Sequence, residues 1–428
     1  MFLRLSFTFL LSNLLVIGDS FPLDIHGVAV DVTTRAPISG AWINAGGQIM
    51  RTSTKGEFQL KTSVKSIDLR AVGYGRLTVP AEAEMHVALS PLRVRGLYMS
   101  FWAVSSQPLR AHIYDTAAKA HLNAVVIDIK GDLGLVGIRT SIPMVAKAGA
   151  NRVITIPDAP ALIVDLHRRG LYAIARIVTF KDSPLAVLRP DLAVKTASGE
   201  LFADNERLHW TDPFNQTVWD YNIQIAVEAA KAGFDEVQFD YVRFPDHPGL
   251  QFSKESNEKN RRAAISGFLA QARKALNPFN VFLSADNFGY VAWNQGDTGI
   301  GQCFEDIGKV VDYISPMLYP SGFRYGIPGL RNPLDDPYRI VYASLEKAKQ
   351  RTGFPGLVFR PWLQAFADYA FDHRVFGKPQ LRQQIKAAED AGTDGWLLWQ
   401  PRNQYPTQAL AELSSELWWK PPVQSAHR

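Results

Sequence analysis

The segment "GFDEVQFDYVRFP", residues 233–245, has the composition of a buried strand, yet an acid ends its apolar run. A strand covered on both faces of a parallel sheet is normally rich in Val, Ile and Phe, and Asp is rarely buried without a partner. Because strand side chains alternate, Gln238 and Asp240 share one face, and Val237 and Phe239 share the other. The pattern predicts a function for Asp240; pairing with Arg243 or capping of a helix is the alternative.

Seven further apolar segments of strand length accompany this one after residue 93, and amphipathic stretches separate them. The stretches at 218–232, 260–276, 341–352 and 379–391 have helical periodicity. Eight strands that alternate with helices are typical of a (β/α)₈ TIM barrel, an α/β fold. The eight strand segments are 94–103, 123–132, 171–180, 234–244, 280–289, 310–320, 356–366 and 394–403.

A doubly wound open sheet is the competing fold. It usually has a glycine-rich phosphate loop after its first strand, and none follows "LYMSFWA" at 97–103. The sequence also contains no GxSxG nucleophile elbow and no HExxH zinc motif. These absences argue against dinucleotide enzymes, nucleoside triphosphatases, elbow-type serine hydrolases and zincins.

Catalytic groups of a barrel project from the carboxyl ends of its strands. Asp240 ends the fourth strand, and Asp286 in "LSADNFGY" ends the fifth. A pair of carboxyl groups on neighbouring strands is what glycoside hydrolysis needs, one as nucleophile or base and one as general acid. We predict Asp240 for the first role and Asp286 for the second; a turn role is the alternative for Asp286.

Further polar and aromatic residues at the predicted strand ends are candidates for substrate binding, because aromatic faces can pack against sugar rings. Each has a structural alternative: an ion pair, a loop contact or a place in the core. The candidates are Asp128, Lys130, Arg243, Tyr319, Arg360, Trp362, Gln364, Trp396 and Trp399. No paired histidines follow the strands, so we predict no metal and no cofactor.

In the roughly 70 residues before the barrel segments, the hydrophobic pattern has a different period. Short alternating runs separated by Gly, Pro, Thr and Lys turns predict an all-β sandwich at 21–92. The order of "SGAWINAGG" at 39–47, "TSTKGEF" at 52–58 and Gly73-Tyr74 resembles the carboxypeptidase-regulatory-like, transthyretin-like modules. The resemblance implies an accessory domain, either a spacer or a glycan-binding unit. The change of period after this module predicts the barrel domain at 93–420, and a tail at 421–428 follows.

The chain begins with Arg4, a largely apolar stretch and small residues before Phe21, which predicts a signal peptide at 1–20. An uncleaved anchor is the alternative. We therefore expect a periplasmic or extracellular protein with no stable membrane insertion after signal removal. A net charge of +5 over 428 residues, without a dense basic block, argues against nucleic-acid binding. The oligomeric state is not predicted.

The barrel part resembles the glycoside hydrolase family known as the DUF4015 domain, over about residues 93–415. The resemblance is carried by "GFDEVQFDYVRFP", "LSADNFGY", "YISPMLYP" and the closing "GTDGWLLWQPRN". It implies a glycosidase in which the strand-four acid, here Asp240, is catalytic. The chain departs from amylase-type barrels in having Arg243 after that acid instead of an arginine two residues before it, and in having Asp286 where a Glu is common.

The leading hypothesis is an exported glycoside hydrolase that cleaves a poly- or oligosaccharide with two carboxylates and no cofactor. One rival is a catalytically inactive glycan-binding or cell-envelope protein. Another is a transglycosidase, which would share the same residues but exclude water.

Overall fold

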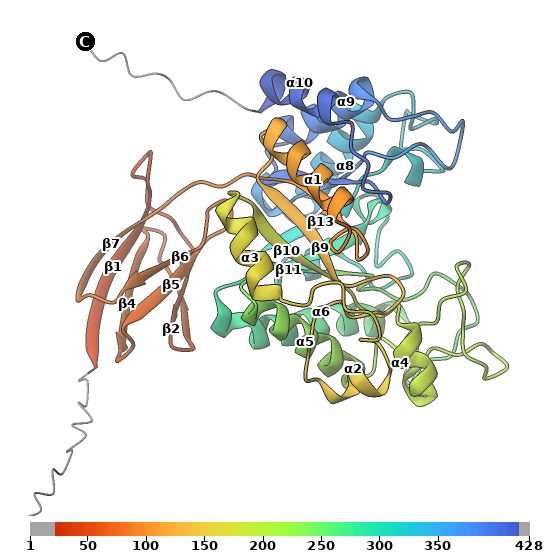
Figure 1. The fold of residues 1–428 in the computed structure, drawn as a ribbon, viewed down its shortest axis with the longest axis horizontal. Helices are drawn as coiled ribbons and strands as arrows, with labels where there is room; N and C mark the ends of the chain where they lie inside the picture. Colours follow the sequence, from red (N-terminus) through yellow and green to blue (C-terminus); the bar gives the residue numbers. More distant parts are fainter. Residues whose placement is uncertain (1–21, 419–428) are drawn as a thin grey trace, which may run out of the picture.

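A computed structural model describes residues 22–418 of the chain. The predicted signal peptide and the predicted tail lie outside the described residues. An all-β domain of two sheets comes first, and an α/β barrel follows (Figure 1). No helix within 22–418 is both long and apolar enough to cross a membrane.

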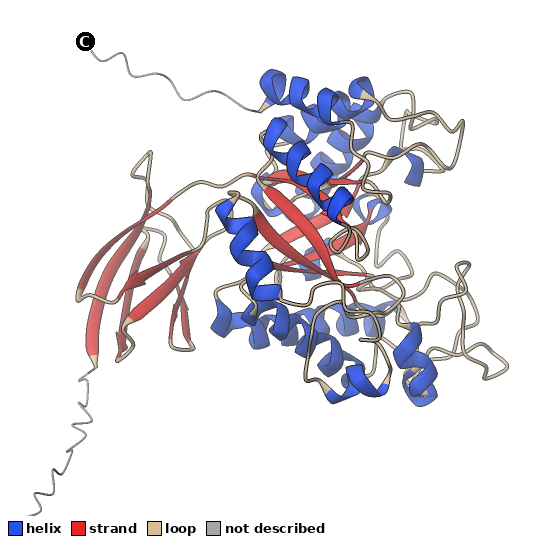
Figure 2. Cartoon of the chain, in the orientation of Figure 1, coloured by secondary structure: helices blue, strands red, loops and turns tan. Residues whose placement is uncertain are grey.

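The barrel is closed by eight parallel strands in sequence order, with the last, β15, pairing with the first, β8. Figure 2 shows helices around the strands of the barrel. This confirms the predicted TIM barrel. The strands are β8 (Val94–Met99), β9 (Ala124–Lys130), β10 (Tyr172–Val178), β11 (Glu236–Asp240), β12 (Phe282–Phe288), β13 (Tyr313–Met317), β14 (Trp362–Gln364) and β15 (Gly395–Trp399).

Helices surround the barrel, and the four helical stretches expected from periodicity correspond to α5, α6, α8 and α9. Pro379 lies in the first turn of α9, where its missing N–H costs nothing. The helices are α1 (Gln107–Lys119), α2 (Pro143–Lys147), α3 (Ala159–Arg168), α4 (Ser183–Leu188), α5 (Gln216–Lys231), α6 (Glu258–Leu276), α7 (Phe304–Ile307), α8 (Pro337–Thr352), α9 (Lys378–Asp390) and α10 (Thr407–Leu417). Short 3₁₀ helices are η1 (Pro190–Leu192), η2 (Asn277–Phe279), η3 (Gly289–Ala292), η4 (Pro320–Gly322) and η5 (Gly356–Val358).

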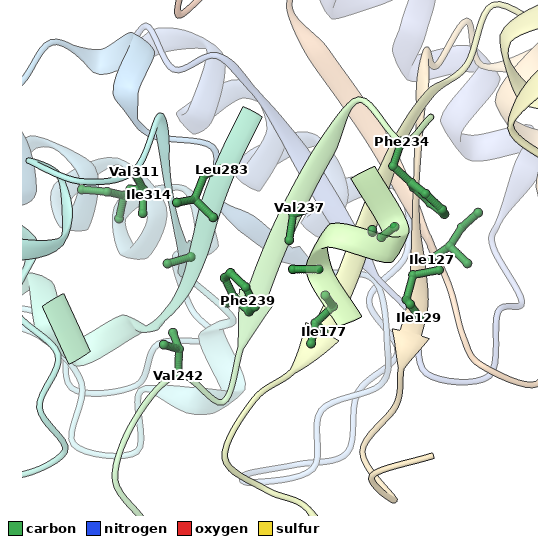
Figure 3. Close-up of a cluster of buried hydrophobic side chains, with 14 of the residues drawn as sticks. Ile127, Ile129, Ile177, Phe234, Val237, Phe239, Val242, Leu283, Val311 and Ile314 are labelled. Atoms are coloured by element: carbon green, nitrogen blue, oxygen red, sulfur yellow. The ribbon is translucent and has the colours of Figure 1, made fainter. Parts of the chain in front are cut away.

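The main core lies between the strands and the helices. Val237 and Phe239 of β11 point into it together with Ile177 and Ile127 of neighbouring strands (Figure 3). A second cluster fills the barrel interior and includes Ile174. The alternation predicted for β11 is therefore correct, and it directs Gln238 and Asp240 inward.

The N-terminal domain is a sandwich of two sheets, as predicted. One sheet has the order β4-β1-β7 and the other β3-β2-β5-β6. Ile25, Ile43, Phe58 and Ile67 from both sheets are buried between them. The strands are β1 (Leu23–Asp31), β2 (Trp42–Ala45), β3 (Gln48–Arg51), β4 (Glu57–Thr62), β5 (Ser66–Arg70), β6 (Leu77–Pro80) and β7 (Glu84–Leu89).

The sandwich is attached to the amino-terminal end of the barrel. Arg76 forms a 2.7 Å ion pair with Asp235, the residue before β11. The backbone N–H of Gly73 donates to the Tyr313 hydroxyl, at the start of β13, over 3.1 Å. Because these contacts lie where the strands begin, the carboxyl ends at the opposite side of the barrel stay open.

Candidate active site

A cavity of about 190 Å³ opens among the carboxyl ends of the barrel strands. Both predicted acids line it, although they come from different strands. The lining residues are Asp132, Arg176, Asp240, Tyr241, Arg243, Asp286, Phe288, Met317, Tyr319, Trp362 and Trp399. The position agrees with the general location of active sites in this fold.

Asp240 is fixed at the edge of this cavity by a forked ion pair. Its Oδ2 accepts from Nε of Arg176 over 3.0 Å and from Nη2 over 2.6 Å. Its Oδ1 accepts from the backbone N–H of Tyr241 over 2.6 Å. Tyr241 has a φ of 47°, a left-handed conformation that is uncommon for a bulky residue and is typical of functional sites. An ion pair and a backbone hydrogen bond thus hold the Asp240 carboxyl group in place.

Arg176 connects three acids and is itself almost completely buried. Besides Asp240, it donates to Asp128 over 2.7 Å and to Asp132 over 3.0 Å. Burial alone would lower the pKa of this guanidinium, but the carboxylates of Asp128 and Asp240 hold it well above its usual value. The group is therefore a permanent positive charge in the wall of the cavity.

The environment of Asp286 differs from that of Asp240, because no cation among the described residues binds its carboxyl group directly. Only 1% of the residue is exposed, and its Oδ1 accepts from Nε1 of Trp362 over 2.7 Å. Burial, followed by the negative charge of Asp240, raises the pKa of Asp286 well above its usual value, whereas Arg176 and the indole lower it. One acid of the cavity is thus bound directly to a guanidinium, whereas burial favours the neutral form of the other.

Asp128 supports Arg176 and lines not the central cavity but a neighbouring one, together with Tyr98. It accepts from the Tyr98 hydroxyl over 2.6 Å and from the backbone N–H of Phe101 over 3.1 Å. Tyr98 stacks on Trp399, with the ring centroids 3.8 Å apart. This chain of contacts links the indole of Trp399, which lines the cavity, to the arginine that binds Asp240.

Four of the nine predicted substrate-binding residues line the cavity: Arg243, Tyr319, Trp362 and Trp399. Arg243 does not bind Asp240 as the sequence suggested; its guanidinium lies 4.9 Å from the Trp210 ring and donates to the carbonyl of Phe244. The arginine that holds Asp240 comes instead from β10.

Lys130 was predicted at the mouth, and the structure corrects this. A register shift in the pairing of β9 with β10 breaks the strict alternation just before it. The ammonium is buried and pairs with Asp182 over 2.6 Å and with Asn222 of α5 over 2.9 Å. Lys130 is therefore a structural residue at the interface with the helices.

Arg360 has the predicted inward direction but lies at the wrong depth. It forms ion pairs with Glu236 over 2.5 Å and with Asp394 over 2.6 Å. Glu236 begins β11, four residues before Asp240. Arg360 therefore neutralises acids at the amino-terminal end of the barrel interior and does not reach the cavity.

Gln364 and Trp396 also differ from the prediction. Gln364 is buried and binds Ser321 through both ends of its amide. Trp396 packs in the helix-side core and donates to Glu389 over 3.0 Å, and Leu397 takes the inward position instead. An all-apolar strand such as "GWLLW" contains nothing that fixes this choice.

Arg176 is the most important residue that sequence reasoning missed. It interrupts the apolar segment "LYAIARIVTF" at 171–180 in the same way that Asp240 interrupts its own strand. Asp132, Tyr241 and Phe288 also line the cavity without having been predicted. Asp132 and Tyr241 follow strands in loops, where alternation gives no guidance, whereas Phe288 ends β12 and shares a face with Asp286 by alternation.

Two larger cavities adjoin the central one. A cavity of about 380 Å³ shares Asp132 and Trp399 with it and extends past Trp102. Another, of about 360 Å³, shares Tyr241 and Arg243 and extends past Trp210. Within 22–418 no three His, Cys, Asp or Glu side chains are grouped as metal ligands. The arrangement suits acid–base and nucleophilic chemistry by two carboxyl groups.

The family described as "Putative glycosyl hydrolase domain" (DUF4015) matches residues 96–405. A hypothetical protein from Ruminiclostridium thermocellum ATCC 27405 is 39% identical, covering 44% of this chain and 96% of its own, with a TM-score of 0.39. The PgaB (BpsB) glycoside hydrolase domain from Bordetella bronchiseptica is 14% identical, covering 77% of this chain and 100% of its own, with a TM-score of 0.57. A β-galactosidase from the psychrophilic Marinomonas ef1 is 11% identical, covering 76% of this chain and 59% of its own, with a TM-score of 0.53. The last two likenesses concern the fold alone. No curated protein matches the chain.

Proposed function

The chain belongs to the DUF4015 family of putative glycosyl hydrolase domains, and on this premise we propose that it hydrolyses O-glycosidic bonds of a poly- or oligosaccharide with Asp240 and Asp286. The observation that carries the proposal is the contrast between these two acids, which line one cavity. Asp240 forms an ion pair with Arg176, whereas burial raises the pKa of Asp286.

This contrast divides the roles in a glycosidase. Asp286 gives its proton to the glycosidic oxygen as the bond from that oxygen to the anomeric carbon breaks. Asp240 either attacks the anomeric carbon or takes a proton from the attacking water, and its charge stabilises the oxocarbenium-like transition state. Trp362 and Arg176 act as positioning residues, since each holds one of the two carboxyl groups.

The inactive glycan-binding alternative would be favoured if an ion pair removed either acid from the cavity. Asp240 is paired, but it remains part of the cavity lining, as does Asp286. A transglycosidase would use the same two residues but transfer the glycosyl group to a sugar instead of to water. Analysis of the products distinguishes it from a hydrolase.

We also propose export to the periplasm or the extracellular space. The support is the sequence at 1–20, with one basic residue, an apolar stretch and small residues before Phe21. Expression of the full chain with its mass measured in cytoplasmic and exported fractions tests this. A full-length product confined to the cytoplasm would contradict it.

The proposed activity is tested by incubating the purified protein and an Asp240→Asn variant with α- and β-linked oligosaccharides and bacterial exopolysaccharides. Mass spectrometry of released reducing ends is the measurement. We expect cleavage by the wild type only, with both proteins folded by circular dichroism. Full activity of the variant would overturn the assignment of Asp240, and longer products without hydrolysis would favour a transglycosidase.

A further inference from the structure

Five aromatic side chains are markedly exposed among the described residues, with exposed fractions from 37% to 79%. They are Trp102, Phe288, Tyr325, Tyr369 and Phe371. Each belongs to a loop or strand end at the carboxyl side of the barrel, after β8, β12, β13 or β14. An exposed aromatic cluster around a cleft is a common sign of a binding surface.

The loops after β12, β13 and β14, which carry four of these rings, are fastened to one another. The Tyr290 hydroxyl accepts from the backbone N–H of Tyr325 over 2.9 Å and donates to the carbonyl of Gly326 over 3.1 Å. Ser321, after β13, donates to Asp368, after β14, over 2.6 Å. Gln364 donates to the same Ser321 hydroxyl over 2.7 Å. These hydrogen bonds join the three loops to one another.

Asp368 also organises the loop that carries Tyr369 and Phe371. Its carboxylate accepts from the backbone N–H groups of residues 370, 371, 372 and 373 at 2.8 to 3.2 Å. Burial raises the pKa of Asp368, but the hydrogen bonds from Ser321 and from this backbone lower it to about 2. The exposed rings are thus presented on a preorganised loop, which reduces the entropy cost of binding.

Two chains of aromatic contacts join these rings to the cavity. Tyr319, in the cavity wall, packs on Phe366, and Phe366 stacks on Tyr369. Phe288, also in the wall, packs on Tyr290, which contacts Tyr325. The aromatic surface is therefore continuous with the cavity that contains Asp240 and Asp286.

We propose that Phe288, Tyr325, Tyr369 and Phe371 form an aromatic platform for a long glycan chain that passes through the cavity and is cleaved internally. The two larger cavities on the β8 to β11 side would hold the chain on the other side of the cleavage point, where Trp102 adds an exposed ring. A site closed at one end would favour removal of terminal sugars, whereas this mouth continues on both sides. The inference rests on the proposed hydrolase function and specifies its substrate class as a polymer.

The test uses two- and six-unit cello-, chito-, malto- and xylo-oligosaccharides together with bacterial exopolysaccharides. The variants are Tyr325→Ala and Tyr369→Ala, singly and combined. Tyr342→Ala on α8, in the helix layer, is the matched control. We expect kcat/KM on long substrates to fall about three- to tenfold for each platform ring, mainly through KM, with no change on the shortest substrate cleaved. Early products should be of mixed internal lengths.

A second measurement does not depend on hydrolysis: affinity electrophoresis of Asp240→Asn, with and without the two platform substitutions, in gels containing each polysaccharide. Retardation that the platform substitutions abolish supports the platform even if the wild type cleaves nothing, in which case the hydrolase proposal alone fails. Equal losses on short and long substrates, products of one terminal sugar, or no retardation in any gel would overturn the platform.

Discussion

Replacing Trp362 by Phe tests the electrostatic account of the acid most sharply. The indole Nε1 donates to Oδ1 of the buried Asp286 over 2.7 Å, and this bond stabilises the ionised form of that acid. Phe keeps an aromatic ring and removes the donor. The proton on Asp286 should therefore be held more tightly in the variant.

The size of the expected pKa shift of Asp286 follows from the energy of the hydrogen bond that the Trp362 indole donates. A hydrogen bond to a charged group contributes about 1.5 to 3 kcal/mol, and about 1.4 kcal/mol corresponds to one pH unit. If Asp286 must be protonated to act, activity is lost as pH rises through its raised pKa. In Trp362→Phe this basic limb should move up by about one to two pH units.

The assay is log kcat/KM against pH for both proteins, on a substrate that the wild type cleaves. The acidic limb, which reports the group that must be ionised, should move less than the basic one. A basic limb that stays in place, or moves to lower pH, would refute the assignment of Asp286 as the proton donor.

Three other predictions concern the same groups. Asp286→Asn should lose activity, yet above neutral pH its free energy of unfolding, measured by urea denaturation, should exceed that of the wild type by about 1.4 kcal/mol for each unit by which the pKa of Asp286 is raised. Because a raised carboxyl pKa lowers stability only as pH rises, this difference in unfolding free energy should shrink at pH 4. A difference that is the same at both pH values would contradict the reasoning. Arg176→Met should lose about 3 to 5 kcal/mol in urea denaturation, because it leaves buried carboxylates unpaired, and should also lose activity. Lys130→Met breaks a buried pair with Asp182 and should lose similar stability while kcat/KM stays near the wild-type value under folding conditions; a large drop in its kcat/KM would return Lys130 to the active site.

Much of the fold could be predicted because it depends on repeated local patterns. Apolar strands that alternate with amphipathic helices define the barrel, and the change of period before residue 93 separates the sandwich from it. The inward direction of Asp240 followed from alternation in a strand whose neighbours Val237 and Phe239 are clearly apolar.

The rest of the site depends on depth and register, which one strand alone does not determine. The shift beside Lys130 reverses its direction, and Arg360 is inward but too low in the barrel. Arg176 could have been found, because a charged residue in a buried strand is the same signal as Asp240. Its pairing with Asp128, Asp132 and Asp240 could not, since these three acids converge on one guanidinium only after the barrel closes.

The central claim is the division of roles between Asp240 and Asp286, and leaving-group dependence tests it most directly. The measurement is kcat/KM of the wild type, Asp240→Asn and Asp286→Asn on two aryl glycosides of the sugar that the wild type releases, one with a dinitrophenolate leaving group and one with a poor phenolate. Because dinitrophenolate leaves without a proton, Asp286→Asn should keep much of its activity on that substrate and lose it on the other, while Asp240→Asn should lose activity on both. Equal losses on both substrates for Asp286→Asn, or retained activity in Asp240→Asn, would contradict the account.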